Sequence, residues 1–399
     1  MSKFITLLFF CCLLCITSGN AYSKEVLQEK TFENGVLFKV QNIHVVRLCG
    51  SYHQMGREYG ALLHDQLAKF YDEIIKLVVN ERKIPMTTVN KIAEDLFQRY
   101  PERFKEVLYG MSETSGLSLQ QHLIINAFEY YIYTSAFDKF ATSKCSAIAA
   151  WGAFTEKGDL IFGRNYDFDI DISRFKKFLV VAAFNPEGSG NSVAIVTFAG
   201  TLNATTDINN KKIFLELNSA GNMVNGLHYY DRIPAPIELF AIMTDSSDLS
   251  QIDRQFHTIN SDSSFIVNVS DPSVAYSYEW PPLGVKRVGA IDDGLLVVTN
   301  NFLDQSWSTY DSHDNADLTL TRRRNLIDLA EQYKGKINIK IMQHILDMGI
   351  KQNGATFYDI KNEGLYTGFQ VLVSDQNSIL WVKVPGVQDW VPINLSILF

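Results

Sequence analysis

One short stretch of the chain gathers residue types that can do nucleophilic chemistry. Residues 144–169 read KCSAIAAWGAFTEKGDLIFGRNYDFD, and a lone cysteine, Cys145, begins the first of two apolar runs. Arg164 and Asp167 come at the end of the second run. A thiolate is a strong nucleophile, and a nearby guanidinium lowers the pKa of the thiol while staying charged at any working pH. A carboxylate such as Asp167 can orient the base that removes the thiol proton.

Cys145 would supply its own base if the peptide bond before it were cut. A free α-amine has a pKa of about 7.7–8.0, so it can accept the thiol proton near neutral pH without a histidine. The same spacing also fits a structural interpretation, in which Arg164 and Asp167 form an ion pair and Cys145 is a small buried residue. The spacing alone leaves both interpretations open.

Two apolar runs on either side of a Lys-Gly turn predict a β-hairpin that would bring these residues together. Residues 146–151 and 160–165 read as strands, and the turn falls at 156–158. The second strand would run back beside the first and end next to Cys145. This hairpin would therefore position the charged residues close to the thiol.

The pattern of the whole chain predicts an α+β fold. Residues from about 50 to 140 carry apolar side chains at three- and four-residue steps, which is typical of amphipathic helices. Gly56 and Gly60 in the first of these helices either permit close helix packing or mark a turn. Short strands joined by tight turns follow, which indicates antiparallel sheets. The predicted strands are 146–151, 160–165, 178–184, 192–198, 213–217, 265–269, 275–280, 295–299, 368–373 and 379–384, and the predicted later helices are 237–243, 320–333 and 339–348.

The first 21 residues predict a removable signal peptide. Lys3 precedes an almost wholly apolar run, and Gly19 and Ala21 are spaced for signal peptidase. The run is shorter than the ~20 residues that span a bilayer, although an uncleaved anchor is the alternative. We expect an exported protein in three parts: the signal peptide 1–21, a helical N-terminal segment 22–144, and a catalytic segment 145–399.

Charge and cysteine content argue against several kinds of partner, scaffold and metal site. The chain has 36 basic and 44 acidic residues, a formal net charge of −8 and no basic cluster, which argues against nucleic acid or an anionic membrane as its main partner. Of its 5 cysteines only Cys49 and Cys145 lie beyond the signal segment, so it is not a disulfide scaffold. No Cys or His spacing resembles a zinc site, and we expect no metal and no cofactor.

The hairpin motif resembles the mature N-terminus of the N-terminal-nucleophile (Ntn) hydrolases that cleave linear amides. This group includes choloylglycine hydrolases, acid-ceramidase-like amidases and the penicillin acyltransferase type, peptidase C45. Their shared pattern is a nucleophilic cysteine, a hairpin and then G-R-N-x-D, which residues 163–167 match. The stretch GSYHQMGREYGALL in the front half is similar to the opening helix of the C45-type precursors in particular.

Three later stretches extend the resemblance and imply further site residues. LLVVTNNF contains Asn300, and in the family the corresponding Asn helps to hold the tetrahedral oxyanion. LTLTRRRNLIDLAEQY resembles the helix that follows, with Arg322 as the expected site arginine and Arg323 as the alternative. ELNSAGNMVNGLHYY resembles the family's N-x-x-G stretch, in which Asn225 or His228 would assist the oxyanion.

The resemblance implies a four-layer αββα Ntn-hydrolase sandwich of antiparallel sheets and an autoproteolytic precursor. Attack of the Cys145 thiol on the Lys144 carbonyl would cut the chain, and the new α-amine would then serve as the base in hydrolysis of a small N-acyl amide. Lys144 departs from the pattern, because these precursors often have Gly there, and Asn301 stands where C45 members often have His. A disulfide between Cys49 and Cys145 would block the nucleophile, so we expect none.

Several questions stay open on the sequence. The acyl amide itself and the oligomeric state are not indicated by any motif. Three other functions fit the same fold: acyl transfer to an amine, ester cleavage of the phospholipase type, and ligand binding by an uncleaved chain.

Overall fold

The computed structural model describes most of the chain beyond the expected signal peptide. The signal segment 1–21 and the bond between Lys144 and Cys145 lie outside the described residues. The described ranges are 26–133, 145–169, 172–220, 229–292, 294–307, 313–358, 365–374 and 378–399.

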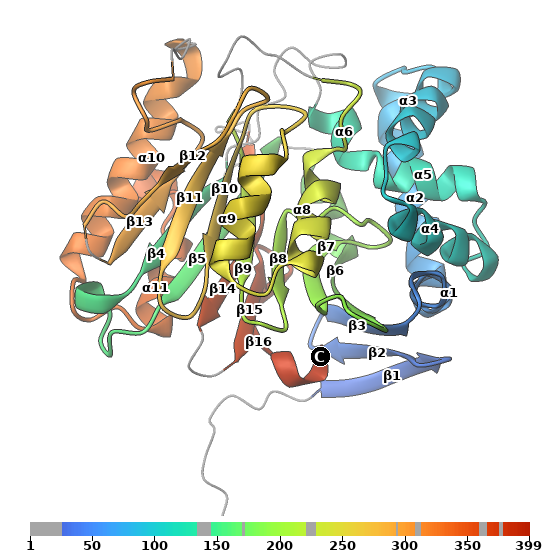
Figure 1. The fold of residues 1–399 in the computed structure, drawn as a ribbon, viewed down its shortest axis with the longest axis horizontal. Coiled ribbons are helices and arrows are strands. Elements are labelled where there is room, and N and C mark those ends of the chain that lie inside the picture. Colours follow the sequence, from blue (N-terminus) through green and yellow to red (C-terminus); the bar gives the residue numbers. More distant parts are fainter. Residues whose placement is uncertain are drawn as a thin grey trace, which may run out of the picture.

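Two sheets form the centre of the molecule (Figure 1). The larger has ten strands in the order β1-β2-β3-β6-β7-β8-β9-β10-β11-β12. Its described strand pairs are antiparallel, except that β3 pairs in parallel with β6. The strands of this sheet are β1 (Val26–Phe32), β2 (Gly35–Val40), β3 (Ile43–Gly50), β6 (Leu179–Pro186), β7 (Val193–Phe198), β8 (Thr206–Asn209), β9 (Phe214–Ser219), β10 (Phe265–Ser270), β11 (Ala275–Trp280) and β12 (Lys286–Val288).

The second sheet is antiparallel throughout its described pairs and has six strands in the order β13-β4-β5-β14-β15-β16. β4 and β5 form its central hairpin. The strands are β4 (Ser146–Ala150), β5 (Ile161–Asp169), β13 (Leu295–Val298), β14 (Leu365–Ser374), β15 (Ile379–Val384) and β16 (Gln388–Asn394).

Helices join the strands and also form most of residues 52–133. The front part holds α1 to α6, with a π-helical turn at Lys76–Glu81 after α2. The helices are α1 (Tyr52–Leu62), α2 (His64–Ile75), α3 (Met86–Gln98), α4 (Glu102–Thr114), α5 (Leu119–Asn126), α6 (Phe128–Tyr133), α7 (Ile172–Phe175), α8 (Ala235–Asp245), α9 (Leu249–Thr258), α10 (His313–Gln332) and α11 (Ile339–Asp347).

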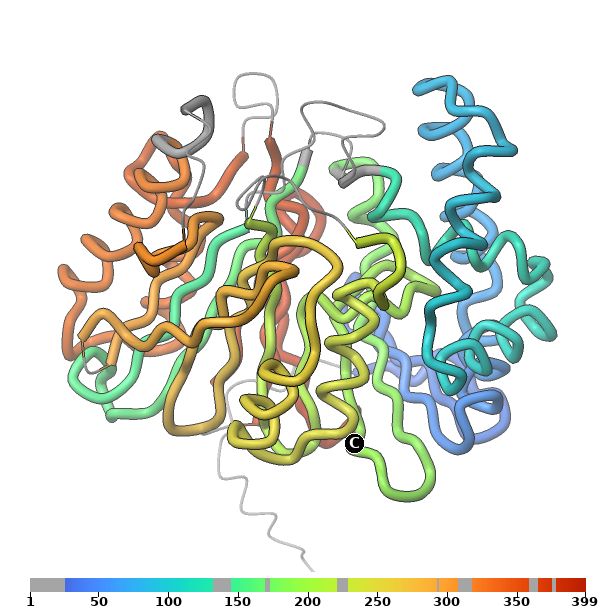
Figure 2. Tube along the Cα trace, turned by 45° about the horizontal axis from the view of Figure 1, so that its top comes forward, coloured from blue at the N-terminus to red at the C-terminus, as the bar shows by residue number. Residues whose placement is uncertain are grey.

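The sheets and helices stack in four layers. α8 packs on β7 and β8 of the ten-stranded sheet, while α10 and α11 pack on the six-stranded sheet. One apolar core fills the space between the sheets and continues under the front helices, and a second core lies between the six-stranded sheet and α10 with α11. Figures 1 and 2 show α1 to α6 gathered at one end of the sheets and α10 at the other. The predicted αββα sandwich is confirmed.

All ten predicted strands and all three predicted later helices correspond to observed elements. The prediction of a helical 22–144 segment, however, does not hold for residues 26–50, which form β1, β2 and β3. β1 is exposed along nearly its whole length, so it carries no alternation of buried and exposed residues that a pattern could reveal. These strands extend the ten-stranded sheet, since β3 pairs with β6.

Close approach of α1 and α4 explains the two glycines of the first helix. A Cβ atom at Gly56 would lie 2.1 Å from the Val107 carbonyl oxygen, and one at Gly60 would lie 2.7 Å from the Met111 carbonyl oxygen. Any larger residue would force the helices apart. Of the two interpretations, close helix packing is confirmed.

Polar side chains fix where several helices begin. Ser51 accepts a hydrogen bond from the backbone N–H of Gln54 at 3.2 Å, and Ser118 forms a reciprocal capping box with Gln121. Such side chains satisfy the first N–H groups, which have no partner within the helix. Within the described ranges, no helix combines the length and the apolar composition needed to cross a bilayer.

Candidate active site

The predicted hairpin is confirmed and places Cys145 at its open end. Ser146, the first residue of β4, pairs with Asn165 of β5 in an antiparallel register. Cys145 comes directly before β4 and is 1% exposed. Its thiol lies 3.8 Å from the backbone carbonyl oxygen of Asp167, to which it donates a weak hydrogen bond. The thiol therefore lies beside the end of the GRNYD motif.

The glycine of that motif has a packing role. A Cβ atom at Gly163 would lie 2.5 Å from Cδ1 of Leu346, which belongs to α11. A larger residue here would require the Leu346 side chain to shift, so glycine allows this packing of α11 on β5.

The Asn side chain of the motif anchors the residue that follows Cys145. Nδ2 of Asn165 donates to the hydroxyl groups of Ser146, at 3.2 Å, and Thr356, at 3.0 Å. Its Oδ1 accepts a hydrogen bond of 2.8 Å from Gln370. All four side chains are buried, so this network fixes the start of β4.

One guanidinium joins three of the predicted site residues. Nη1 of Arg322 donates to the backbone carbonyl oxygen of Cys145 at 3.2 Å and lies 3.4 Å from Oδ2 of Asp167. Nη2 donates to Oδ1 of Asn300 at 2.8 Å. Arg322 and Asp167 are both fully buried, and burial lowers the pKa of Arg322, an effect that the Asp167 carboxylate opposes. α10 thus brings a buried cation to the nucleophile.

The register of the three consecutive arginines is settled by the same contacts. Arg322 lies in the cluster, whereas Arg323 donates from Nε to the carbonyl oxygen of Val297 at 3.1 Å. Arg323 is also less buried than its neighbour. Arg322, the first choice from the sequence, is therefore the arginine beside Cys145.

Asn300 follows β13 and lies between two elements of the site. Besides accepting from Arg322, it donates from Nδ2 to the carbonyl oxygen of Ser219 at 2.6 Å. Ser219 ends β9, just before the stretch that holds the second predicted oxyanion residue. That residue, Asn225, and its alternative, His228, both lie outside the described residues.

Asp167 is held from its other side by a residue that the sequence did not single out. The hydroxyl of Thr367 donates to Oδ1 of Asp167 at 2.5 Å and accepts the backbone N–H of Phe357 at 3.0 Å. Thr367 lies opposite Asp167 in β14, next to a register shift in the pairing. Burial raises the pKa of Asp167 to about 7, against the opposing effects of Arg322 and Thr367.

Arg164 reaches from β5 across to the ten-stranded sheet. Its guanidinium donates to the carbonyl oxygen of Thr205 and, at 2.6 Å, to the hydroxyl of Thr206. It also donates to the carbonyl oxygen of Leu217 at 3.3 Å and lies 3.4 Å from Oε2 of Glu216. Arg164 and Glu216 are both fully buried. The described contacts of Arg164 therefore tie the two sheets together behind the nucleophile.

These contacts bear on the structural interpretation of the motif, in which Arg164 pairs with Asp167. The close ion pairs join Arg164 to Glu216 and Asp167 to Arg322 instead. Arg164 also lies close enough to the buried carboxyl group of Asp207 to oppose the rise that burial causes in its pKa. Arg322 is the arginine that interacts electrostatically with Cys145, and a cation beside a thiol favours the thiolate.

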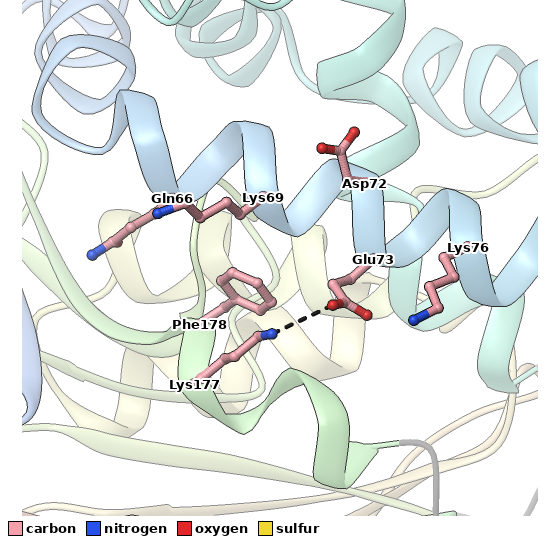
Figure 3. Close-up of a pocket in the computed structure, with 7 residues that line it drawn as sticks. All are labelled: Gln66, Lys69, Asp72, Glu73, Lys76, Lys177 and Phe178. Carbon is pink, nitrogen blue, oxygen red and sulfur yellow. Dashed lines mark hydrogen bonds and ion pairs between the residues drawn. The ribbon is translucent and has the colours of Figure 1, made fainter.

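One open hollow, of about 460 Å³, lies beside α2 and away from this cluster. Lys177 pairs with Glu73 in it at 3.4 Å (Figure 3). It is lined by Gln66, Lys69, Asp72, Glu73, Lys76, Lys177 and Phe178.

None of the predicted site residues that the structure describes lines this hollow, and Cys145, Arg164, Asp167 and Arg322 are all buried. No group of three or more His, Cys, Asp or Glu in the described ranges is placed to hold a metal ion. Cys49 and Cys145 are not joined by a disulfide, as expected.

Comparison with known proteins finds similarity at the level of structure. No protein-family model matches the chain, and no curated protein matches it either. An N-acylethanolamine-hydrolyzing acid amidase ortholog from Caenorhabditis elegans is 17% identical, with a TM-score of 0.41 over 57% of this chain and 92% of its own.

Two bacterial structures are similar to a comparable extent. A variant of conjugated bile acid hydrolase from Clostridium perfringens is 12% identical, with a TM-score of 0.48 over 63% of this chain and 93% of its own. Penicillin V acylase from Agrobacterium tumefaciens is 10% identical, with a TM-score of 0.44 over 63% and 86% of the two chains. The narrower resemblance to peptidase C45 stays a prediction from the sequence.

Proposed function

We propose that this protein is a cysteine amidohydrolase that cleaves a linear N-acyl amide through a thioester on Cys145. The observation that carries the proposal is the buried contact of Arg322 with Cys145, Asp167 and Asn300. A thiol, a buried cation, a carboxyl and an amide donor are the parts that acyl transfer through a thioester requires. The site needs no cofactor for this chemistry.

Activation begins with self-cleavage of a precursor. The Cys145 sulfur adds to the carbonyl carbon of Lys144, and the C–N bond between the two residues breaks as the nitrogen takes up a proton. This step leaves Lys144 attached to sulfur as a thioester. Water then adds to the thioester, which releases the Lys144 carboxyl group and leaves Cys145 with a thiol and a free α-amine.

Substrate hydrolysis uses the new α-amine as the base. It accepts the thiol proton as sulfur attacks the amide carbonyl, and it returns a proton to the leaving amine when the tetrahedral intermediate collapses. Water hydrolyses the resulting thioester and frees the acid. Arg322 and Arg164 supply positive charge near the sulfur throughout.

Among the residues that the structure describes, Asn300 is the proposed hydrogen-bond donor to the oxyanion. An amide group has two N–H donors, and one of them is used by the Ser219 carbonyl oxygen. The second remains for the oxyanion, while Arg322 binds Oδ1 and fixes the plane of the amide. Loss of one such donor typically lowers the rate by about 10²–10³. Asn225 is the proposed second donor.

The sequence features outside the described residues complete the proposal. We infer that segment 1–21 is a signal peptide, that the mature chain is exported, and that cleavage separates residues 22–144 from 145–399. The substrate is a small N-acyl amide, and this substrate class follows only from the family resemblance.

Intact-mass measurement of the purified protein beside Cys145→Ala tests the proposal. Fragments beginning at Tyr22 and Cys145 are expected for the wild type, and one uncut chain for the variant. Cys49→Ala is the matched control, since it removes the other cysteine of the mature chain and should cleave normally.

Activity is then measured on a panel of N-acyl amides, with a competing amine added to detect acyl transfer. Cleavage at another bond, or full amide hydrolysis by Cys145→Ala, would refute the proposal. If the acyl group is found attached to the added amine, the acyl-enzyme transfers it to amines and the protein is an acyltransferase.

A further inference from the structure

The loop that holds Arg164 is itself held by helices that precede the cleavage position. Residues 199–205 connect β7 to β8. We call them, together with Thr206 at the start of β8, the arginine loop, because Thr205 and Thr206 both accept hydrogen bonds from Arg164. The position of this loop therefore helps to decide where the guanidinium lies. One helix that contacts the loop, α8, follows the cleavage position, since the Ala204 N–H donates to the carbonyl oxygen of Pro236 at 3.2 Å. Three other helices that contact the loop, α1, α5 and α6, precede that position.

Two front helices fix the first half of the arginine loop. The hydroxyl of Tyr59, on α1, accepts the backbone N–H of Gly200 at 3.1 Å. Asn126, on α5, accepts the backbone N–H of Leu202 at 2.9 Å and donates to the carbonyl oxygen of Gly200 at 2.9 Å. Both side chains are buried, so water does not compete for these contacts.

Glu129, on α6, binds both the arginine loop and β5, the strand that carries Arg164 and Asp167. Nδ2 of Asn203 donates to its Oε2 at 3.1 Å, and the hydroxyl of Tyr166 donates to its Oε1 at 2.8 Å. The Tyr166 ring lies 5.3 Å from Cζ of Arg164, and Tyr166 is the residue before Asp167. Glu129 is 4% exposed. One carboxylate thus connects the two elements that flank the Arg164 guanidinium.

We propose that Glu129 is a positioning residue for Arg164. This inference rests on the proposed function, since it takes Arg164 as part of the amidase site.

The physical reason is that the Glu129 contacts are buried and shared. Without the carboxylate, the Tyr166 hydroxyl and the Asn203 amide would lose their acceptors and turn toward other partners. Burial raises the pKa of Glu129 to about 7, while Tyr166, Asn203 and then Arg164 oppose the shift. The carboxyl group can therefore change its charge near neutral pH, close to Arg164.

Two variants separate the acceptor role of Glu129 from its charge. Glu129→Gln keeps an acceptor for Tyr166 but removes the charge, whereas Glu129→Leu removes both. Glu58→Gln is the matched control, because Glu58 is also a buried carboxylate of the front segment, residues 22–144, and binds the backbone N–H groups of Asn34 and Cys49. All are made in the full-length chain and checked by thermal unfolding.

We expect Glu129→Leu to lower kcat by about 10²-fold, the loss that misplacement of a catalytic group by ~1 Å can cause. Glu129→Gln should cause a smaller loss and a changed pH profile of kcat, and Glu58→Gln should leave kcat, KM and the profile unchanged.

The positioning role would be overturned if Glu129→Gln and Glu129→Leu both fold and both have the kcat, KM and pH profile of the wild type. If Glu129→Leu does not fold, the result for Glu129→Gln decides alone. If the wild type hydrolyses no amide, the proposed function fails, and the alkylation rate of Cys145, followed by peptide mass, decides instead. Slower alkylation in Glu129→Leu supports the positioning role, and an unchanged rate overturns it.

Discussion

Arg322 and Cys145 are 177 residues apart in the chain, yet Nη1 of Arg322 lies 3.2 Å from the backbone carbonyl oxygen of Cys145. The arginine therefore binds the main chain of the nucleophile and fixes the residue while leaving its sulfur available for chemistry. Since the same nitrogen lies 3.4 Å from Asp167, the orientation of Cys145 and the charge of Asp167 depend on one side chain.

Replacement of Arg322 should damage both stability and activity. Arg322→Met leaves the buried Asp167 carboxylate without its cation, which typically costs about 3–5 kcal/mol in the free energy of unfolding. Arg322→Lys keeps the charge, but a single ammonium cannot reproduce the planar fork that reaches Cys145, Asp167 and Asn300. We expect Arg322→Lys to fold and to lose most of its kcat, as measured by amide hydrolysis.

Arg323→Lys is the control for this prediction, because Arg323 contacts the Val297 carbonyl oxygen and lies outside the cluster. Its kcat should stay close to that of the wild type. Equal losses in the Arg322 and Arg323 variants would contradict the assignment of Arg322.

Removal of the Thr367 hydroxyl should raise the pKa of Asp167. That hydroxyl donates to the carboxylate, which stabilises the charged form, so its loss in Thr367→Val favours the protonated form. If hydrolysis requires charged Asp167, the acid limb of the kcat profile moves from near pH 7 to higher pH. Thr367→Ser keeps the hydroxyl and should restore the wild-type profile, and a Thr367→Val profile that matches it would refute the coupling.

The parts of the site that the sequence predicted are those that lie close together in the chain. Cys145, Arg164 and Asp167 belong to one hairpin, so strand patterning and a turn were enough to place them near one another. Thr367 lies 200 residues from Asp167, and its role depends on the pairing of β14 with β5, which leaves no local signal.

Other features depend on the angular position of a side chain about its helix or on burial. Three consecutive arginines differ only in the direction that each takes from α10, and the contacts of Arg322 and Arg323 distinguish them. Glu129 reads as one more charged residue of an amphipathic helix. Its functional interest comes from burial against Tyr166 and Asn203, which only the folded chain reveals.

Gly56→Ala should separate α1 from α4 and destabilise the front segment. The added methyl group would lie 2.1 Å from a backbone oxygen of Val107, which cannot rotate away as a flexible side chain would. Overpacking of this kind typically costs about 1–3 kcal/mol, or more when backbone must shift. Gly289→Ala is the control, since no atom lies within 4 Å of the added carbon. Urea unfolding measures both, and equal stabilities would contradict the close contact.

Glu129→Gln should become more stable relative to the unsubstituted chain as the pH rises. The pKa of Glu129 is about 7 in the folded protein and 4.5 in the unfolded chain. Between these pH values the folded state therefore keeps a proton that the unfolded state has lost. The contribution of Glu129 to the free energy of unfolding is therefore largest below pH 4.5, falls as the pH rises to 7, and is level above it. A shift of this size corresponds to about 3 kcal/mol.

Glutamine does not titrate, so the unfolding free energy of Glu129→Gln minus that of its parent should rise by up to about 3 kcal/mol between pH 4.5 and 8. Both chains carry Cys145→Ala, which keeps them uncut, and urea unfolding at each pH gives the difference. Glu113→Gln is the control, because hydrogen bonding to Arg57 lowers the pKa of the exposed Glu113 and the difference should change in the opposite direction. If the difference in unfolding free energy for Glu129→Gln stays constant with pH, the Glu129 carboxyl group has the same pKa in the folded and unfolded chains. Its charge would then not change near neutral pH beside Arg164.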